Sequence, residues 1–439
     1  MKHFTLILSA LFCLFSSNSF AQPGGGSTKS SPSGATYKLT SGSETLLNTT
    51  YESTTSDYNV LQVTGGTLTV NNCTIKKSAG DTSDSDGSSF FGINSAVYVA
   101  GSSAVINMTG GTITTTAKGS NAGFAYNSGT LNISDVTINN TGNLSRGIHA
   151  TGGGIINATN LNVTTAGSNS SVVATDRGGG TVTVTKGSYV TTGTDCAILY
   201  STGTITANDA TGSSSKGEVG VIEGNNTITI NNCDFTSGSS TRGLMILQSG
   251  SGDSQGYNGK ITINGGKITL TDSSAPLCEI PTNMTGTLTL KDVTLTVPSA
   301  VLMKVDYNTR WSTYGGTGYL VLETDSSWNV TGTVAMDNYA KALNVTVGKG
   351  VTWNLTANTT VSTLTVEAGG TINTNGYTLT ATTTNNSGTI TNGIKTVQSD
   401  ASISGKVYSI DGVLQNTNTD TSKLQAGIYI LNGKKIMMK

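Results

Sequence analysis

Ten polar or aromatic residues recur at one place in a repeating pattern, each at or just after a short apolar run. Only 11% of the 439 residues are charged, so acids and bases at such a place are conspicuous. Tyrosine rings can stack on sugar rings, and polar side chains can bond hydroxyl groups, so this set suits an extended carbohydrate. The ten are Tyr98, Tyr126, His149, Asp176, Arg177, Tyr200, Glu223, Gln248, Glu279 and Asp306. The binding candidates among them are Tyr98, Tyr126, His149, Tyr200, Glu223 and Gln248.

Four of the ten are the candidates for acid–base catalysis: Asp176, Arg177, Glu223 and Glu279. Hydrolysis or elimination in a sugar chain needs two or three acids close together, or calcium-binding carboxylates beside a basic residue. In the repeat described below, successive acids stand two or more coils apart, which is too far to flank one bond unless the chain bends. We therefore expect binding rather than catalysis, with a polysaccharide lyase or glycoside hydrolase as the alternative.

One loop carries three carboxylates that could meet a calcium ion. Asp81, Asp84 and Asp86 stand in "DTSDSDGSS", but the spacing of an EF-hand and its distal Glu are missing. We expect a solvated loop there, with no metal and no cofactor.

A template of alternating apolar and polar residues positions all of these side chains. It recurs mostly every 23 to 27 residues, with longer steps after Leu68 and Ile228 that leave room for loops. Short units that cannot bury an apolar face alone are satisfied by stacking, which predicts an all-β, right-handed parallel β-helix. The template occurs at Leu68–Ile75, Ile106–Ile113, Leu131–Ile138, Ile156–Val163, Val182–Tyr189, Ile205–Gly212, Ile228–Phe235, Ile261–Ile268 and Leu288–Leu295. From Arg310 the spacing shortens, which predicts narrower coils.

Two cysteines, Cys73 and Cys233, occupy the same small or apolar column of the template. Six coils separate them, about 29 Å at the spacing of strands. A disulfide needs Cα atoms within about 7 Å, so the two cannot pair. Cys196 and Cys278 lie in the second strand of their coils, and we expect all four to be buried thiols.

The ends of the chain differ from the repeat. Residues 1–21 have a basic start, an apolar run and a small-residue cleavage site, which predicts a signal peptide. Residues 22–36 read as a Gly/Ser/Pro linker, 37–393 as the β-helix and 394–439 as a small C-terminal β domain. The net charge of −1 argues against a nucleic-acid partner, and no later run is apolar enough for a transmembrane helix.

Two segments resemble known families. Thr191–Thr356, with "VIEG" and "MILQSGSGDSQG", is similar to adhesin-like bacterial surface β-helix proteins of the pectate-lyase-like fold. The C-terminal "VY" at Val407–Tyr408, Gly412 and "GIYI" at Gly427–Ile430 resemble a type IX secretion sorting domain. These resemblances imply an adhesin or glycan-contacting scaffold, secreted or on the outer-membrane surface. Its partners would be glycans or host surface molecules, and secretion machinery acting through the C-terminal domain.

Overall fold

A computed structural model describes residues 29–249, 253–308 and 315–391, with parts of the C-terminal region at 396–397, 407–410, 413–416, 424, 426–431 and 434–438. The predicted signal peptide and residues 22–28 of the predicted linker lie outside the described residues. The first strand, β1, begins at Gly34, and Lys29 already contacts Asp57. The ordered rod therefore starts a few residues inside the segment expected to be a linker.

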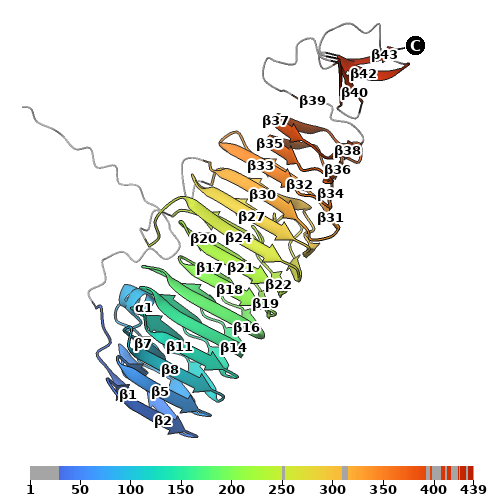
Figure 1. Cartoon of the computed structure of the whole chain (residues 1–439). Coiled ribbons are helices and arrows are strands. Elements are labelled where there is room, and N and C mark those ends of the chain that lie inside the picture. The colour runs from blue at the N-terminus through green and yellow to red at the C-terminus, as the bar shows by residue number, and fades with distance from the viewer. Residues whose placement is uncertain are drawn as a thin grey trace, which may run out of the picture.

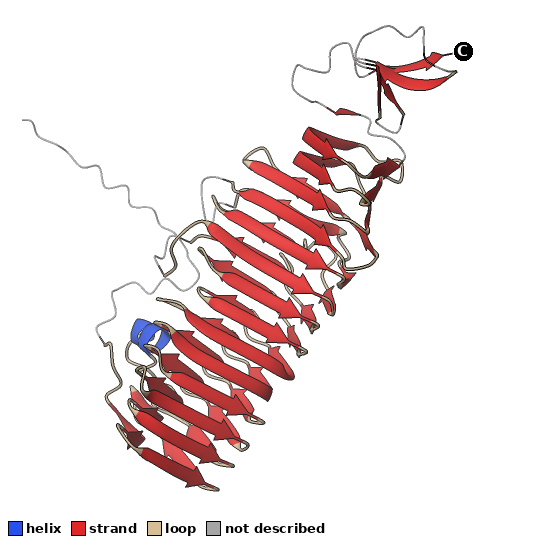
Figure 2. Cartoon of the chain, viewed as in Figure 1, coloured by secondary structure: helices blue, strands red, loops and turns tan. Residues whose placement is uncertain are grey.

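The chain coils into a right-handed parallel β-helix, as the repeat predicted (Figures 1 and 2). The first long sheet, called sheet A here, consists of β1 (Gly34–Leu39), β4 (Tyr58–Val63), β7 (Val97–Ala100), β10 (Gly123–Tyr126), β13 (Ile148–Thr151), β15 (Val173–Thr175), β17 (Leu199–Ser201), β20 (Gly220–Glu223), β23 (Leu244–Leu247), β26 (Cys278–Ile280), β29 (Val301–Val305) and β32 (Thr333–Met336).

The second long sheet, sheet B, bends so that most coils contribute two strands or one long strand to it. Its first half holds β2 (Ser43–Leu47), β5 (Gly66–Asn71), β8 (Ala104–Thr109), β11 (Thr130–Ser134), β14 (Gly154–Thr165), β16 (Gly180–Thr191), β18 (Thr204–Asn208), β21 (Thr227–Asn231), β24 (Asn258–Asn264), β27 (Thr285–Lys291), β30 (Thr317–Glu323), β33 (Ala342–Val347), β35 (Thr359–Val366), β37 (Leu379–Asn386) and β39 (Thr396–Val397). Its second half holds β3 (Thr50–Ser53), β6 (Thr74–Lys77), β9 (Thr112–Thr115), β12 (Thr137–Asn140), the ends of β14 and β16, β19 (Thr211–Ser214), β22 (Asp234–Ser237), β25 (Lys267–Leu270) and β28 (Thr294–Thr296).

The register of sheet B aligns the apolar positions of the template along the rod. Each of these residues pairs with its counterpart in the next coil, from Leu68 at one end to Leu364 at the other. Stacking in register lets coils that could not bury their apolar faces alone share one continuous interior. The aligned residues are Leu68, Ile106, Leu131, Ile156, Val182, Ile205, Ile228, Ile261, Leu288, Leu320, Val345 and Leu364.

The last coils are narrower, as the shortened spacing predicted. After β32 no further strand joins sheet A among the described residues, and a short sheet C takes up the second side of the rod. Sheet C consists of β31 (Trp328–Thr331), β34 (Val351–Asn354), β36 (Thr371–Asn373) and β38 (Thr389–Thr391).

The bend of sheet B uses residues that tolerate a left-handed backbone. Asp135 and Asn160, and likewise Asp209 and Asn232, stand at the equivalent position of two neighbouring coils, with φ between 51° and 55°. Short polar side chains populate this region more readily than most others. Asn160 donates a hydrogen bond of 2.7 Å to Asp135, and Asn232 one of 2.8 Å to Asp209. These Asp and Asn residues therefore form the corner at which sheet B bends.

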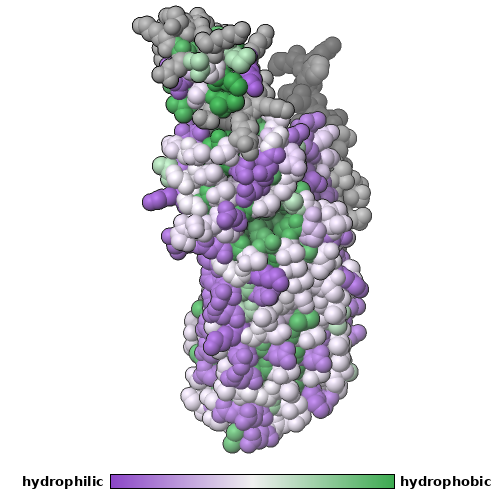
Figure 3. Space-filling view, turned by 90° about the vertical axis from the view of Figure 1, so that its right-hand side faces the viewer, coloured by the Kyte–Doolittle hydropathy of each residue, from purple (hydrophilic) through white to green (hydrophobic). Residues whose placement is uncertain are grey.

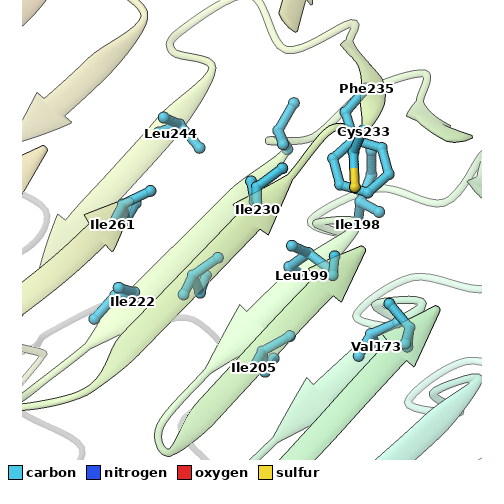
Figure 4. Packing of buried hydrophobic residues seen from close by; sticks show 14 of the residues in the cluster. Val173, Ile198, Leu199, Ile205, Ile222, Ile230, Cys233, Phe235, Leu244 and Ile261 are labelled. Carbon is cyan, nitrogen blue, oxygen red and sulfur yellow. The ribbon is translucent and has the colours of Figure 1, made fainter. Parts of the chain in front are cut away.

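The interior is dry and aliphatic along most of its length. Figure 4 shows Ile205 and Ile261, which belong to one row, with Ile230 on the strand between them, Leu199 and Ile222 nearby and Cys233 beside Phe235. All four described cysteines are free and buried, which confirms the sequence prediction. An exception to the apolar filling is Lys77, a fully buried lysine that donates to the Thr55 carbonyl and to Ser53.

The C-terminal region forms a small antiparallel sheet D. It contains β40 (Val407–Ser409), β41 (Leu414–Asn416), β42 (Gly427–Leu431) and β43 (Lys434–Met438). Strands β42 and β43 pair in an antiparallel arrangement, and residues 432–433 between them lie outside the described residues. In the described part of the chain, no helix has the length and apolar character to span a membrane.

Candidate functional site

The outer face of sheet A is buried over much of its length, unlike an ordinary outer face of a β-helix. Tyr98, Phe124, His149 and Ala174 follow one another in register on this face. Each is at most 3% exposed. An outer apolar cluster of Ala197, Val221, Met245 and Leu247, with Tyr200 packed against it, continues the face. Side chains pointing out of the rod can be this buried only if other segments cover them, and two insertions do so.

The first insertion contains a helix that the sequence reading did not predict. Helix α1 (Ser85–Phe91) follows the long step after Leu68 and begins at Asp84, whose carboxylate accepts a hydrogen bond of 2.9 Å from the Gly87 amide. Side chains of later coils hold the middle and the C-terminal end of this helix. Asn121 donates to the Ser88 carbonyl over 3.1 Å, and Thr151 donates to the Phe90 carbonyl over 2.7 Å.

The second insertion follows β23, within the long step after Ile228 where the sequence left room for a loop. Its described residues fold back along the rod toward earlier coils. Ser249 donates to Glu223, and Asn226 donates to Ser254 over 2.7 Å. Gln248 donates to the carbonyls of Ser249 and Ser254 over 3.1 and 3.0 Å, so this predicted ligand residue shapes the insertion.

Arg177 contacts both insertions. Its guanidinium lies 3.8 Å from the centre of the Phe90 ring in α1 and forms an ion pair of 2.6 Å with Asp253 of the second insertion. A cation over an aromatic face and a short ion pair both fix its position. Arg177 is thus a clamp between the two insertions rather than a free base.

Between the insertions lies a cleft of about 410 Å³. Residues from the outer face of sheet A, the corners before it, helix α1 and the second insertion all line it. The lining residues are Ser85, Ser89, Phe90, Lys118, Asn143, Leu144, Arg146, Ser168, Asn169, Ser171, Asp176, Asp195, Ala197, Tyr200, Glu218, Val221, Glu223 and Asp253. The volume lies in the range of about 300–1,000 Å³ that ligand sites usually have.

Glu223 is held in the cleft by neighbours from two directions. The Tyr200 hydroxyl donates to one carboxylate oxygen over 2.8 Å, and the Ser249 hydroxyl donates to the other. Burial, together with the nearby Glu223 carboxylate, raises the pKa of Tyr200 well above its usual value. Tyr200 therefore stays protonated and remains a hydrogen-bond donor.

Asp176 is fully enclosed and stands beside Arg146. The closest ion-pair distance between them is 3.5 Å, and Arg146 also donates to Ser89 of α1 over 2.7 Å. Burial raises the pKa of Asp176 to about 7 despite the opposing effect of Arg146, and the carboxylates of Asp253 and Glu223 contribute to the rise. Near neutral pH this carboxyl can therefore donate or accept a proton.

A buried triad extends the site at one end. Arg242 forms ion pairs with Glu218, at 3.2 Å, and with Glu279. Burial raises the pKa of both carboxyls, and Arg242 opposes the rise. Glu279 is not among the cleft residues, so the structure separates it from Asp176 and Glu223.

The remaining predicted ligand residues lie outside the cleft. His149 is fully buried, and its ring meets Phe124 edge to face with 4.9 Å between centroids. Tyr98 stacks on the other side of Phe124, and Tyr126 packs against Phe91 of α1. Asp306 pairs with Lys304 at 2.6 Å. Of the six binding candidates, the cleft therefore includes Tyr200 and Glu223.

The three candidate calcium ligands have separate structural roles. Asp84 caps α1, Asp81 accepts a hydrogen bond of 2.8 Å from the Lys118 amide, and Asp86 is buried within the helix. No group of three potential metal-ligating side chains comes together in the ranges that the structure describes. The loop expected to be solvated is thus partly a buried helix.

Sequence reasoning missed Arg146, Glu218, Asp195 and Asp253 as members of the site. Arg146 stands three residues before the chosen His149. Glu218 stands three residues before Val221, which lies in the same column of sheet A as His149 and Tyr200, so the register could have found both. Asp253 comes from an inserted loop, which no repeat pattern can place.

Comparison with known proteins gives no relative: no family matches this chain, and neither do any curated protein or solved structure.

Proposed function

We propose that this protein is an exported β-helix that binds an extended glycan in the cleft and acts as an adhesin or glycan-contacting scaffold. The observation that carries the proposal is an open cleft on a rigid sheet that combines polar side chains with aromatic and aliphatic ones. The half-buried Leu144 and Tyr200 offer surfaces for the C–H face of a sugar ring, while the lining residues Phe90 and Val221 are only 3% and 2% exposed.

The polar residues of the cleft are held in place before any ligand arrives. Tyr200 fixes Glu223, Arg146 lies beside Asp176, and the Ser168 amide donates a hydrogen bond of 2.9 Å to the side-chain oxygen of Asn143. A preformed site loses little side-chain entropy on binding, which favours affinity.

A glycan array with the mature chain tests this proposal, and Ser168→Trp is the variant that blocks the cleft. Thr229→Trp, on the outer face of sheet B, is the matched control because both residues are half-buried outside the core. The expected result is binding by the wild type and the control, with at least tenfold loss for Ser168→Trp. Equal binding by all three proteins, or binding by none, would contradict the proposal.

Hydrolysis is a second candidate because of where Asp176 and Glu223 stand. Registers place them at equivalent outward positions two coils apart, about 10 Å at the spacing of strands. An inverting glycosidase uses carboxyls about 6.5–9.5 Å apart, which leaves room for water, so the side chains of Asp176 and Glu223 would have to lean toward each other to fit this range. Asp176 would protonate the leaving oxygen while Glu223 takes a proton from the attacking water.

Release of reducing ends from glycans found on the array separates the two candidates. Product formation that disappears in Asp176→Asn would favour the hydrolase, and binding without product would favour the scaffold. Asp234→Asn, an exposed acid on sheet B, is the control.

The proposed place of action is the outer-membrane surface or the medium, supported by the leader and the C-terminal sequence pattern. Removing residues 394–439 is expected to retain the protein inside the cell, which fractionation of a producing strain would measure. Unchanged export of the shortened chain would contradict a sorting role.

Figure 3 shows that the face on the right-hand side of Figure 1 is mostly neutral or hydrophilic, with small hydrophobic areas. This surface supports recognition by polar contacts rather than burial in a lipid phase.

A further inference from the structure

The cleft carries more negative than positive charge, and this bears on which sugars it takes. Five lining carboxyls, those of Asp176, Asp195, Glu218, Glu223 and Asp253, face two lining cations, Lys118 and Arg146. The neighbouring arginines reduce the excess without removing it: when Arg177, Arg242 and Glu279 are included, six carboxyls face four cations. Arg177 is paired with Asp253, and Arg242 is shared between Glu218 and Glu279.

Building on the proposed glycan binding, we infer that the cleft selects saccharide units that carry a protonated amine, such as a hexosamine with a free amino group. Charges opposite in sign to the site attract a ligand, and charges of the same sign are repelled. An ammonium group is therefore favoured over a neutral substituent, and a uronate is excluded.

Continuing the registers of sheet A places Thr202 between Asp176 and Glu223, one coil from each. Thr202 is 4% exposed and is not among the residues that line the cleft. The acceptors that a ligand meets on this row are therefore the carboxyls of Asp176 and Glu223.

The apolar side chains beside this row favour an amine on a sugar ring over a bare cation. Leu144 and Tyr200 offer a surface for C–H groups, which an inorganic ion lacks. The methylene groups of a linear polyamine could contact the same surface, but ordering its flexible chain costs more entropy than binding a rigid sugar ring.

Binding of an ammonium group should also displace a proton. Asp176 has a pKa of about 7, so it is partly protonated near neutral pH. A positive charge close by stabilises the carboxylate and lowers this pKa. Proton release on binding is therefore expected for an amino sugar and not for its N-acetylated form.

Calorimetric titration of the mature chain with three matched oligosaccharides tests the inference: glucosamine, N-acetylglucosamine and galacturonate oligomers of equal length. The glucosamine oligomer is expected to bind at least tenfold more tightly than the N-acetylated one, with weaker binding at high salt. Its heat should depend on the buffer at pH 7 because protons are released. The galacturonate oligomer is expected not to bind.

Two variants test which carboxylates of the cleft favour the ammonium group. Glu223→Gln keeps an acceptor for Tyr200 and should lower affinity for the glucosamine oligomer only. Asp195→Asn, at the exposed rim, should also lower the affinity for the glucosamine oligomer. This change leaves the hydrogen bonds and ion pairs of the buried carboxyls unaltered. Asp234→Asn should change nothing.

The outcomes separate this inference from the proposed function. Equal affinity for the glucosamine and N-acetylated oligomers, or tighter binding of the galacturonate oligomer, would overturn the inference and leave glycan binding intact. If spermidine displaced the glucosamine oligomer and bound with equal affinity, the inference that the ligand is a saccharide would be overturned. Absence of binding to every oligosaccharide would overturn both.

Discussion

Tyr200 donates a hydrogen bond of 2.8 Å to Glu223, which stands one coil further along the rod. A side chain of one coil thereby fixes a carboxylate of the next. This contact joins the repeat, which supplies the spacing, to the chemistry of the cleft.

Tyr200→Phe should lower the free energy of unfolding by about 1.5–3 kcal/mol, because a hydrogen bond to a buried charged group is lost. Tyr189→Phe is the matched control. Tyr189 is fully buried, and its hydroxyl has no hydrogen-bond partner in the described ranges, so its removal should cost nothing. Urea unfolding of both variants provides the measurement, and equal losses would refute the role given to the contact.

Asp176→Asn should change the pH dependence of stability. Burial raises the pKa of Asp176 from 3.8 to about 7, so the folded state favours the protonated form. Its stabilising contribution is complete below about pH 4 and is lost as the pH rises to 7. The wild type should lose Tm relative to Asp176→Asn across this window, while the exposed control Asp234→Asn tracks the wild type. A difference that does not vary with pH would contradict this assignment.

Lys77→Met should reveal the cost of a charge in the core. Burial lowers the pKa of Lys77 from 10.5 to about 8. Because the folded state disfavours the charged form, the wild type gains stability relative to the variant as the pH rises from 8 to 10. Melting curves across that range test this, and Lys76→Met, at the exposed neighbour, should show no such trend. If the difference in Tm between the wild type and Lys77→Met did not change with pH, burial of the Lys77 charge would be contradicted.

The four thiols outside the predicted leader should be unreactive while the protein is folded. All four are buried, and burial raises the pKa of Cys233 to about 11 and that of Cys196 and Cys278 also. A thiol reagent at pH 8 should label none in buffer and four in guanidinium chloride, and reductant should not alter Tm. Rapid labelling of the native protein would show that the interior is open.

The periodic part of the fold could be predicted because each coil must bury the same positions. Leu68, Ile228 and Leu288 align as expected, and Cys73 and Cys233 are separated as the column required. Helix α1 could not be predicted, since it is one short helix stabilised by contacts with Asn121 and Thr151 from later coils. No local pattern contains those contacts.

The candidate site was predicted in part for the same reason. The register placed Tyr200, Asp176 and Glu223 on one face, and the cleft includes all three. The sequence did not indicate that the insertions would bury His149 and Tyr98 or pair Arg177 with Asp253. Those outcomes depend on how inserted loops fold over the sheet.

The two insertions leave the rod at fixed coils, α1 before β7 and the other after β23. A solenoid can gain or lose length only in whole coils, so the number of coils between the insertions works as a molecular ruler. Removing one complete coil would bring the two insertions closer by about 4.8 Å without altering either insertion. Ligand length could thus be adjusted in discrete steps while the dry interior stays the same.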